Sequence, residues 1–193
     1  MGDLLGTSYL LAPLLGGAVF HGLCVRYGWL SFLARPIDRG RTLRKAPVFG
    51  ANKTYRGLAA LALGTGALAG LQTDVLHQVA ALRSLELFDY GGMNGWFFGA
   101  GMGAASMLAE LPNSFFKRRL GIPPGRSAGG MLGAFLYILD QVDLVVGVWL
   151  TVAVTAPSAI TPNRILLSFA IVFVVHQATN VLGYALRMRS TPR

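Results

Sequence analysis

The chain has 193 residues, of which 53% are hydrophobic and only 13% are charged. Because a soluble domain carries about 25% charged residues, this composition excludes a soluble globular protein and any disordered or fibrous class. The net charge of +9 would suggest nucleic acid in a soluble chain, but a membrane protein carries such an excess in its cytoplasmic loops. We therefore expect one membrane-embedded domain over residues 1–193, with no nucleic-acid partner.

Five apolar segments follow one another along the chain. Each is long enough to cross a bilayer core about 30 Å thick, and the alternation of a barrel strand is absent. The first segment lacks a basic leader and a cleavage site, so we expect it to be retained rather than removed as a signal peptide. The sequence predicts an all-α integral membrane protein, a bundle of five transmembrane helices at Leu4–Val25, Leu58–Leu82, Gly92–Leu111, Met131–Ala156 and Ile165–Leu186.

The positions of the basic residues predict the orientation of the bundle. Of the 17 Lys and Arg residues, only Arg83 and Arg164 lie in the second and fourth connections. All others lie in the first loop, in the third loop or at the C-terminus, and cytoplasmic segments are the ones that collect such charges. We therefore expect an outside N-terminus, a cytoplasmic C-terminus and cytoplasmic loops at about 26–56 and 113–130. The expected location is the cell membrane (the inner or plasma membrane), as a multi-pass protein with its active site facing the cytoplasm.

Small residues recur every fourth position in two of the predicted spans. Such spacing lets helix backbones approach closely in lipid, so we predict close packing inside the bundle rather than a dimer interface. The oligomeric state stays open. The small residues are Gly91, Gly95, Gly99 and Gly103 in the third span and Ala62, Gly66 and Gly70 in the second.

Three acids stand where a charge is costly. Asp140 and Asp143 share one face of an apolar helix, and no Lys or Arg lies within ten residues of either. A divalent metal would neutralise them; the alternative is a protonated or water-exposed pair near a helix end. Glu110 ends the third span, where we expect Pro112 to stop the helix. It could join the same ion, or it is a plain interfacial glutamate.

Two basic clusters lie in the expected cytoplasmic loops. Lys117, Arg118 and Arg119 follow the third span, where the helix dipole and topology both favour cations. The other cluster enters the N-terminal end of the second span, where the dipole favours anions instead. Its polar and basic residues, which would suit a phosphate, are Asn52, Lys53, Thr54 and Arg56.

These features together predict one kind of chemistry. Carboxylates hold Mg²⁺, Mg²⁺ and cations hold phosphates, and the bilayer supplies an amphiphilic substrate. The sequence therefore predicts phosphoryl or nucleotidyl transfer to a lipid.

Several motifs occur in the order found in a known superfamily. Ser114-Phe-Phe-Lys117-Arg118-Arg119, Gly125 and Leu139-Asp140-Gln141-Val142-Asp143 resemble the CTP-dependent lipid cytidylyltransferases. The chain is more closely similar to the small CDP-archaeol synthase family over about residues 35–184, and the five-helix plan of that family agrees. This likeness rests on Pro36-Ile-Asp38, the loop from Phe49 to Gly57, Lys117-Arg118-Arg119-Leu-Gly121 and His176-x-x-x-Asn180.

Two positions depart from the family pattern. Ala109-Glu110 stands where the family has Gly-Asp, so the geometry of a metal ligand there differs. Arg39 stands where the family has a glycine after Asp38. Neither departure touches Asp140, Asp143 or the basic run after the third span.

The resemblance implies a reaction in which CTP and a membrane lipid phosphate give a CDP-lipid and pyrophosphate in phospholipid biosynthesis. It assigns catalysis to Asp140, Asp143, Lys117 and Arg118, and Mg²⁺ binding to Asp140, Asp143 and Glu110. The alternatives are another lipid phosphotransferase or kinase, or a non-enzymatic cation transporter. The residues expected to bind CTP and the lipid phosphate are Asn52, Lys53, Thr54, Arg56, Ser114 and Arg119.

Overall fold

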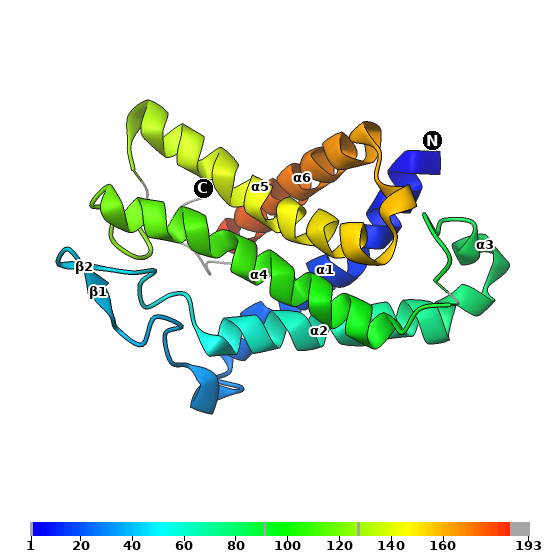
Figure 1. The fold of residues 1–193 in the computed structure, drawn as a ribbon, viewed down its shortest axis with the longest axis horizontal. Coiled ribbons are helices and arrows are strands. Elements are labelled where there is room, and N and C mark those ends of the chain that lie inside the picture. Colours follow the sequence, from blue (N-terminus) through cyan, green and yellow to red (C-terminus); the bar gives the residue numbers. More distant parts are fainter. Residues whose placement is uncertain (1, 91, 127, 186–193) are drawn as a thin grey trace.

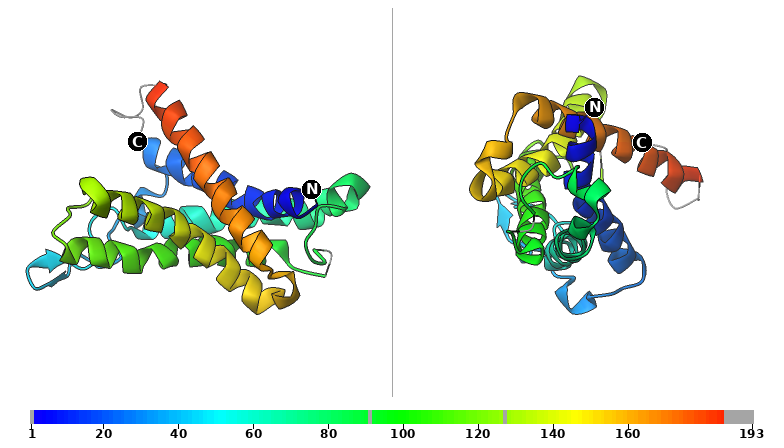
Figure 2. Two further views of the ribbon diagram at one scale, coloured as in Figure 1. Left: turned by 90° about the horizontal axis from the view of Figure 1, so that it is seen from above. Right: turned by 90° about the vertical axis from the view of Figure 1, so that its right-hand side faces the viewer.

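Five long helices make up most of the computed structural model, which describes residues 2–90, 92–126 and 128–185. In Figure 1, α2, α4 and α5 run along the long axis of the molecule, and Figure 2 shows α6 crossing them obliquely. The mainly helical fold confirms the prediction from sequence. The long helices are α1 (Gly2–Arg26), α2 (Tyr55–Asp74), α4 (Gly95–Arg119), α5 (Gly130–Thr155) and α6 (Pro162–Ala185).

Short elements fill the connections. The loop after α1 carries a two-stranded antiparallel ribbon, β1 (Thr42–Leu43) and β2 (Ala46–Pro47). The single-turn helix α3 (Ala80–Arg83) lies in the connection between α2 and α4, at the opposite end of the bundle (Figure 1). Short 3-10 helices occupy Ser31–Leu33, Leu76–Gln78 and Pro157–Ala159.

Within the described residues, three helices are long and apolar enough to cross a membrane by length and composition: α1, α2 with its 3-10 extension to Gln78, and α5. Of the other two long helices, α4 ends in three consecutive basic residues, and α6 is apolar over Pro162–Ala178, the part of it whose side chains are described. A bundle of five spans therefore stays a prediction. The last predicted residue of the fifth span, Leu186, lies outside the described residues.

Two predicted boundaries are wrong. The second helix ends at Asp74 rather than Leu82: the backbone changes to a 3-10 helix at Leu76–Gln78, and the side chain of Gln78 donates to the Asp74 carbonyl (3.0 Å). The third continues through Pro112 to Arg119, although the proline removes one backbone N–H from the ladder. The connection between α4 and α5 therefore covers residues 120–129, so the first part of the expected cytoplasmic loop, about 113–130, is helical; its position relative to the membrane stays a prediction. Residues expected in that loop instead project from the last two turns of α4.

Glycines bring α2 and α4 into backbone contact. A Cβ atom added at Gly99 would lie 2.5 Å from the Ala69 Cβ and 2.5 Å from the Thr65 carbonyl oxygen. One added at Gly103 would lie 2.5 Å from the Leu61 carbonyl oxygen. This confirms the predicted packing of small residues inside the bundle, while Gly91 lies outside the described residues.

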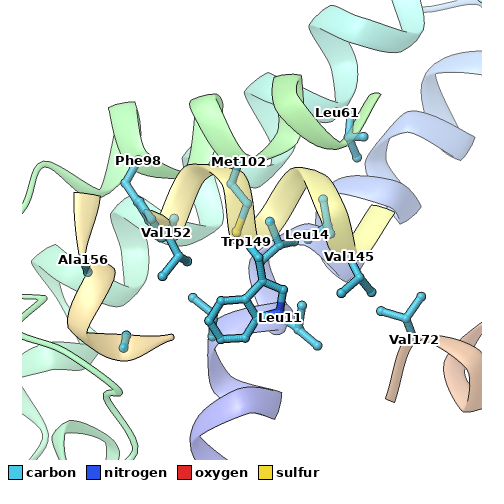
Figure 3. Close-up of a cluster of buried hydrophobic side chains, with 14 of the residues drawn as sticks. Leu11, Leu14, Leu61, Phe98, Met102, Val145, Trp149, Val152, Ala156 and Val172 are labelled. Carbon is cyan, nitrogen blue, oxygen red and sulfur yellow. The ribbon is translucent and has the colours of Figure 1, made fainter. Parts of the chain in front are cut away.

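The apolar core lies around Trp149 of α5 and takes side chains from all five long helices (Figure 3). The indole N–H of Trp149 donates to the Ser168 hydroxyl of α6 (3.1 Å), which gives the one polar atom of this side chain a partner. At the far end, the Asp3 carboxylate accepts from Arg164 Nε and Asn163 Nδ2 (both 2.9 Å), which ties the start of α1 to the start of α6. Buried neighbours in the core include Leu11, Leu14, Met102, Val145, Val152 and Val172.

We predict that Gly99→Ala destabilises the protein by about 1–3 kcal/mol, because the added methyl group forces α2 and α4 apart. Thermal unfolding in detergent measures the effect. Gly101→Ala on the same helix is the matched control, since its Cβ would be 3.8 Å from the Thr151 Cγ2, an ordinary contact. Equal unfolding temperatures for the two variants would contradict the close packing.

Candidate active site

A charged cavity of about 500 Å³ lies at the end of the bundle that carries β1 and β2. Its walls come from the last turns of α4, the first half of α5, residue 176 of α6 and the two loops at residues 27–54 and 120–129. The charged and polar lining residues are Asn52, Lys53, Glu110, Ser114, Lys117, Arg118, Arg126, Tyr137, Asp140 and His176. The fold thus gathers in one cavity seven residues that the sequence analysis singled out from three separate segments.

Each of two lysines in this cavity is paired with a carboxylate. Lys53, from the first loop, forms an ion pair with Glu110 of α4. Lys117 of α4 reaches across to α5, where its Nζ lies 2.5 Å and 2.6 Å from the two carboxylate oxygens of Asp140. The metal prediction rested on the lack of a Lys or Arg near the two acids in the sequence. In the folded protein Lys117 lies beside Asp140.

Asn113 links the two acids of α5. Its side-chain nitrogen donates to Asp140 Oδ1 (2.8 Å) and to Asp143 Oδ2 (2.9 Å). Asn113 was not among the site residues predicted from the sequence. Its position one turn before Lys117 places both side chains on one helix face only because α4 continues past Pro112. Asp143 itself does not line the cavity, but it is joined to Asp140 through this amide.

The donor set here suits a hard divalent cation. Asp140 and Asp143 offer carboxylate oxygens, and the Asn113 Oδ1 atom is buried with no hydrogen-bond partner. Mg²⁺ prefers such oxygen ligands and keeps several waters, so few protein ligands suffice. Among the described residues no group of three or more His, Cys, Asp or Glu side chains could hold a metal. Glu110, the predicted third ligand, is instead paired with Lys53.

Two arginines predicted to contact substrate also hold the walls together. The buried Arg118 donates from Nε to the Phe49 carbonyl (3.0 Å) and from Nη1 to the Ile122 carbonyl, and thereby joins both loops. Arg119 donates to the carbonyls of the β1–β2 ribbon, at Leu43 (2.6 Å), Ala46 (3.1 Å) and Pro47 (2.5 Å). The first loop is therefore fastened to the end of α4.

Two other predicted binding residues lie outside the cavity lining. Thr54 is the N-cap of α2, where its hydroxyl accepts the Gly57 N–H (3.1 Å). Arg56 follows in the first turn of the helix, and its Nε is buried without a hydrogen-bond partner. The role of these two residues in binding CTP or lipid phosphate stays a prediction.

His176 of α6 lies on the cavity wall beside Tyr137 of α5, with the ring centroids 6.0 Å apart. The Tyr137 hydroxyl donates to the side chain of Gln177, which connects the two helices. The sequence analysis noted His176 and its partner motif residue Asn180, whose side chain lies outside the described part, but it missed Tyr137.

Asp38 organises the first loop. Its carboxylate accepts the backbone N–H groups of Gly40, Phe49 and Gly50, each at 2.9 Å. Burial opposes ionisation of this carboxyl, but the three donors outweigh it and hold the pKa of Asp38 below its usual value. Gly50 has a φ of +98°, and a Cβ there would lie 2.7 Å from the Pro124 Cγ, so the two loops meet at this glycine.

We predict that Asp38→Ala loosens the first loop and increases trypsin cleavage between Arg35 and Lys53 by about tenfold or more, because three backbone N–H groups lose their acceptor. Cleavage is followed by mass spectrometry at neutral pH. In the wild type the same loosening is expected only in acid. Because folding lowers the pKa of Asp38, its ionised carboxylate stabilises the folded loop fully above pH 3.8, the ordinary value. This stabilisation is lost as the pH falls through the folded pKa of Asp38.

Asp74→Ala, which removes an exposed carboxylate at the opposite end of α2, is the control. Cleavage of the first loop should be unchanged by it. Equal cleavage of the Asp38→Ala variant and the wild type would contradict the role of this carboxylate.

Comparisons with known proteins agree with the geometry. Residues 24–192 match the profile of the family described as CarS-like, CDP-archaeol synthase. A CDP-archaeol synthase of Methanococcoides burtonii is 32% identical over 166 residues, which cover 82% of this chain and 90% of that protein. One of Haloarcula marismortui is 36% identical over 165 residues, with 82% and 83% covered.

A solved structure has the same fold. It is described as an intramembrane enzyme for archaeal membrane lipids biosynthesis and aligns with a TM-score of 0.61 at 24% identity. The alignment covers 90% of this chain and 92% of that one. With most of its length matched in sequence, this chain belongs to the CDP-archaeol synthase family.

Proposed function

We propose that this chain transfers the cytidylyl group of CTP to a membrane lipid phosphate, giving a CDP-activated lipid and pyrophosphate in phospholipid biosynthesis. Family membership supports the reaction, and the relatives' names favour an isoprenoid ether lipid as the acceptor. The observation that carries the proposal is the cavity at the end of the apolar helices. There Lys53 and Lys117, from segments far apart in sequence, lie beside Glu110 and Asp140.

The chemistry needs charge neutralisation more than proton transfer. An oxygen of the lipid phosphate attacks the α-phosphorus of CTP, and the bond from that phosphorus to the β-phosphate oxygen breaks. The electron pair of this bond leaves with pyrophosphate. A phosphate monoester is already largely ionised near pH 7, so no general base is required. Lys53 and Lys117 would hold the two anionic reactants together in the cavity.

We also propose Mg²⁺ as the cofactor, held by Asp140 and Asp143. When bound there, the ion would neutralise the triphosphate and favour departure of pyrophosphate. The oxygen donors of the site support this assignment, and the polar link through Asn113 keeps both carboxylates on one side of α5.

The cavity is proposed to face the cytoplasm of a cell membrane that all five long helices cross, with the N-terminus outside. The distribution of basic residues supports this orientation, because the two loops at the cavity end and the helix ends that adjoin them carry 12 of the 14 Lys and Arg residues of the described chain. CTP would then reach the cavity from the cytoplasm and the lipid phosphate from the inner leaflet.

CTP labelled separately at the α- and γ-phosphates tests the function directly. Purified protein is incubated with Mg²⁺ and either an ether-linked isoprenoid phosphate or a diacyl phosphatidic acid. We expect label in the lipid from the α-position only, with preference for the ether lipid. Label from the γ-position would instead identify a lipid kinase, and no lipid label from either position would overturn the proposal.

We predict that Lys117→Met lowers turnover at least tenfold, since the cavity loses a cation that neutralises the reacting phosphates. The α-label assay measures the rate, and thermal unfolding in parallel confirms that the variant is folded. Lys45→Met is the matched control, because Lys45 lies exposed on the turn between β1 and β2. It should stay within twofold of wild type; equal rates for both variants would refute the assignment.

A further inference from the structure

The side-chain amide of Asn113 is held at one end only. Its nitrogen donates to the carboxylates of Asp140 and Asp143, whereas its oxygen is buried with no hydrogen-bond partner. The residue is only 5% exposed, so bulk water has little access to hydrogen-bond that oxygen. The two negative charges alone therefore determine which end of this amide faces them.

The position of the amide nitrogen matches a ligand position around a metal ion. In an octahedron with metal–oxygen bonds of about 2.0–2.1 Å, neighbouring ligand oxygens are about 2.9 Å apart. The Asn113 nitrogen lies 2.8 Å from Asp140 Oδ1 and 2.9 Å from Asp143 Oδ2. An oxygen placed where this nitrogen now lies would thus be at the distance of a neighbouring ligand from each of the two carboxylate oxygens.

A cation between the carboxylates reverses the charge that the amide faces. The positive end of the amide dipole is favoured beside two free carboxylates, and the negative end is favoured beside a divalent ion. A half-turn about the terminal side-chain bond exchanges the two ends, because the amide is planar and its nitrogen and oxygen have similar size. Because the buried oxygen has no partner, the rotation breaks only the two hydrogen bonds that the nitrogen donates, and the bound cation replaces them as the partner of both carboxylates.

Glu110 is engaged elsewhere. Its carboxylate pairs with Lys53, which belongs to the first loop. To join the ion it would have to leave this lysine, whereas Asn113 already contacts both aspartates. Asn113 is therefore better placed than Glu110 to supply the third protein ligand from α4.

Resting on the proposed function, we infer that Asn113 turns its amide when a divalent cation binds and presents Oδ1 as the third protein ligand beside Asp140 and Asp143. Glu110 remains the partner of Lys53 and is not a ligand. In the metal-free protein the same amide is a neutral bridge, whose nitrogen donates a hydrogen bond to each of the two carboxylates. In that state Lys117 neutralises Asp140 by bonding to both of its carboxylate oxygens. When the ion binds, it takes one of these two oxygens, and Lys117 keeps the other.

Binding of Mn²⁺ alone, without CTP or lipid, tests the inference on the full chain in detergent. The loss of the electron paramagnetic resonance signal of aqueous Mn²⁺ gives the affinity. Asn113→Leu should weaken binding at least tenfold, because a ligand is lost. If the amide were only a hydrogen-bond donor, its removal would leave Mn²⁺ affinity unchanged or stronger, since the competing hydrogen bonds disappear. That result would overturn the inference.

Two further variants complete the series. Asn113→Asp keeps an oxygen at this position and should bind Mn²⁺ at least as tightly as wild type. Glu110→Gln removes the carboxylate predicted from sequence and should change the affinity less than twofold. A loss with Glu110→Gln as large as that with Asp143→Asn would make Glu110 the ligand and refute the assignment to Asn113.

A measurement on the wild type decides the matter even where Asn113→Leu fails to fold. With asparagine carrying ¹³C in its side-chain carbonyl, bound Mn²⁺ should show a ¹³C coupling in electron–nuclear double resonance. The coupling should vanish in Asn113→Asp; its absence from wild type, or its survival in that variant, would refute the inference. CDP-lipid formation is assayed separately. If the protein makes the lipid but shows no coupling, only the assignment of Asn113 as a ligand is refuted. If it shows the coupling but makes no product, only the proposed function is refuted.

Discussion

The contact between the polar end of α4 and the acids of α5 is the constraint on which the site depends. Carboxylates in an apolar helix are costly unless other groups satisfy them, and α4 supplies both Lys117 and Asn113 for this purpose. These two side chains can reach α5 only because the helices pack closely farther along. A Cβ at Gly147 would lie 2.3 Å from the Ser106 backbone, and the Ser106 hydroxyl donates to the Leu144 carbonyl (3.1 Å).

The sequence predicted the features that depend on local pattern. Apolar length predicted five long helices, and the small residues at Gly99 and Gly103 correctly predicted close packing against α2. What depended on tertiary distance could not be predicted. Lys117 neutralises Asp140 across 23 positions of the sequence, so a search for nearby cations along the chain could not find it. The helix through Pro112 is a similar case, since buried contacts beyond the proline outweigh the lost hydrogen bond.

The two departures from the family pattern have different structural consequences. Arg39 adopts a φ of +52° and Gly40 one of +74°, in a turn closed by the Arg41 N–H and the Asp38 carbonyl (2.9 Å). Positive φ at both central positions is the pattern of a type I′ turn, in which a glycine avoids the steric cost of about 1–2 kcal/mol that arginine incurs. The hydrogen bonds to the Asp38 carboxylate offset this cost locally. Glu110 instead pairs with Lys53, a residue that the proposed function places at the substrate phosphates.

The charges of the cavity couple its occupants. In the two ion pairs, Lys53 with Glu110 and Lys117 with Asp140, positive and negative charges balance. The side chains of these pairs are partly exposed, so water screens their charges, but phosphate groups that draw away a lysine still leave a carboxylate uncompensated. A divalent cation that draws away the carboxylate leaves a lysine uncompensated in turn. At the pair of Lys117 and Asp140, a nucleotide phosphate and a cation that enter together each supply the partner that the other removes. On the proposed function, CTP and the metal ion therefore bind with positive coupling, and by reciprocity each strengthens the other by the same factor.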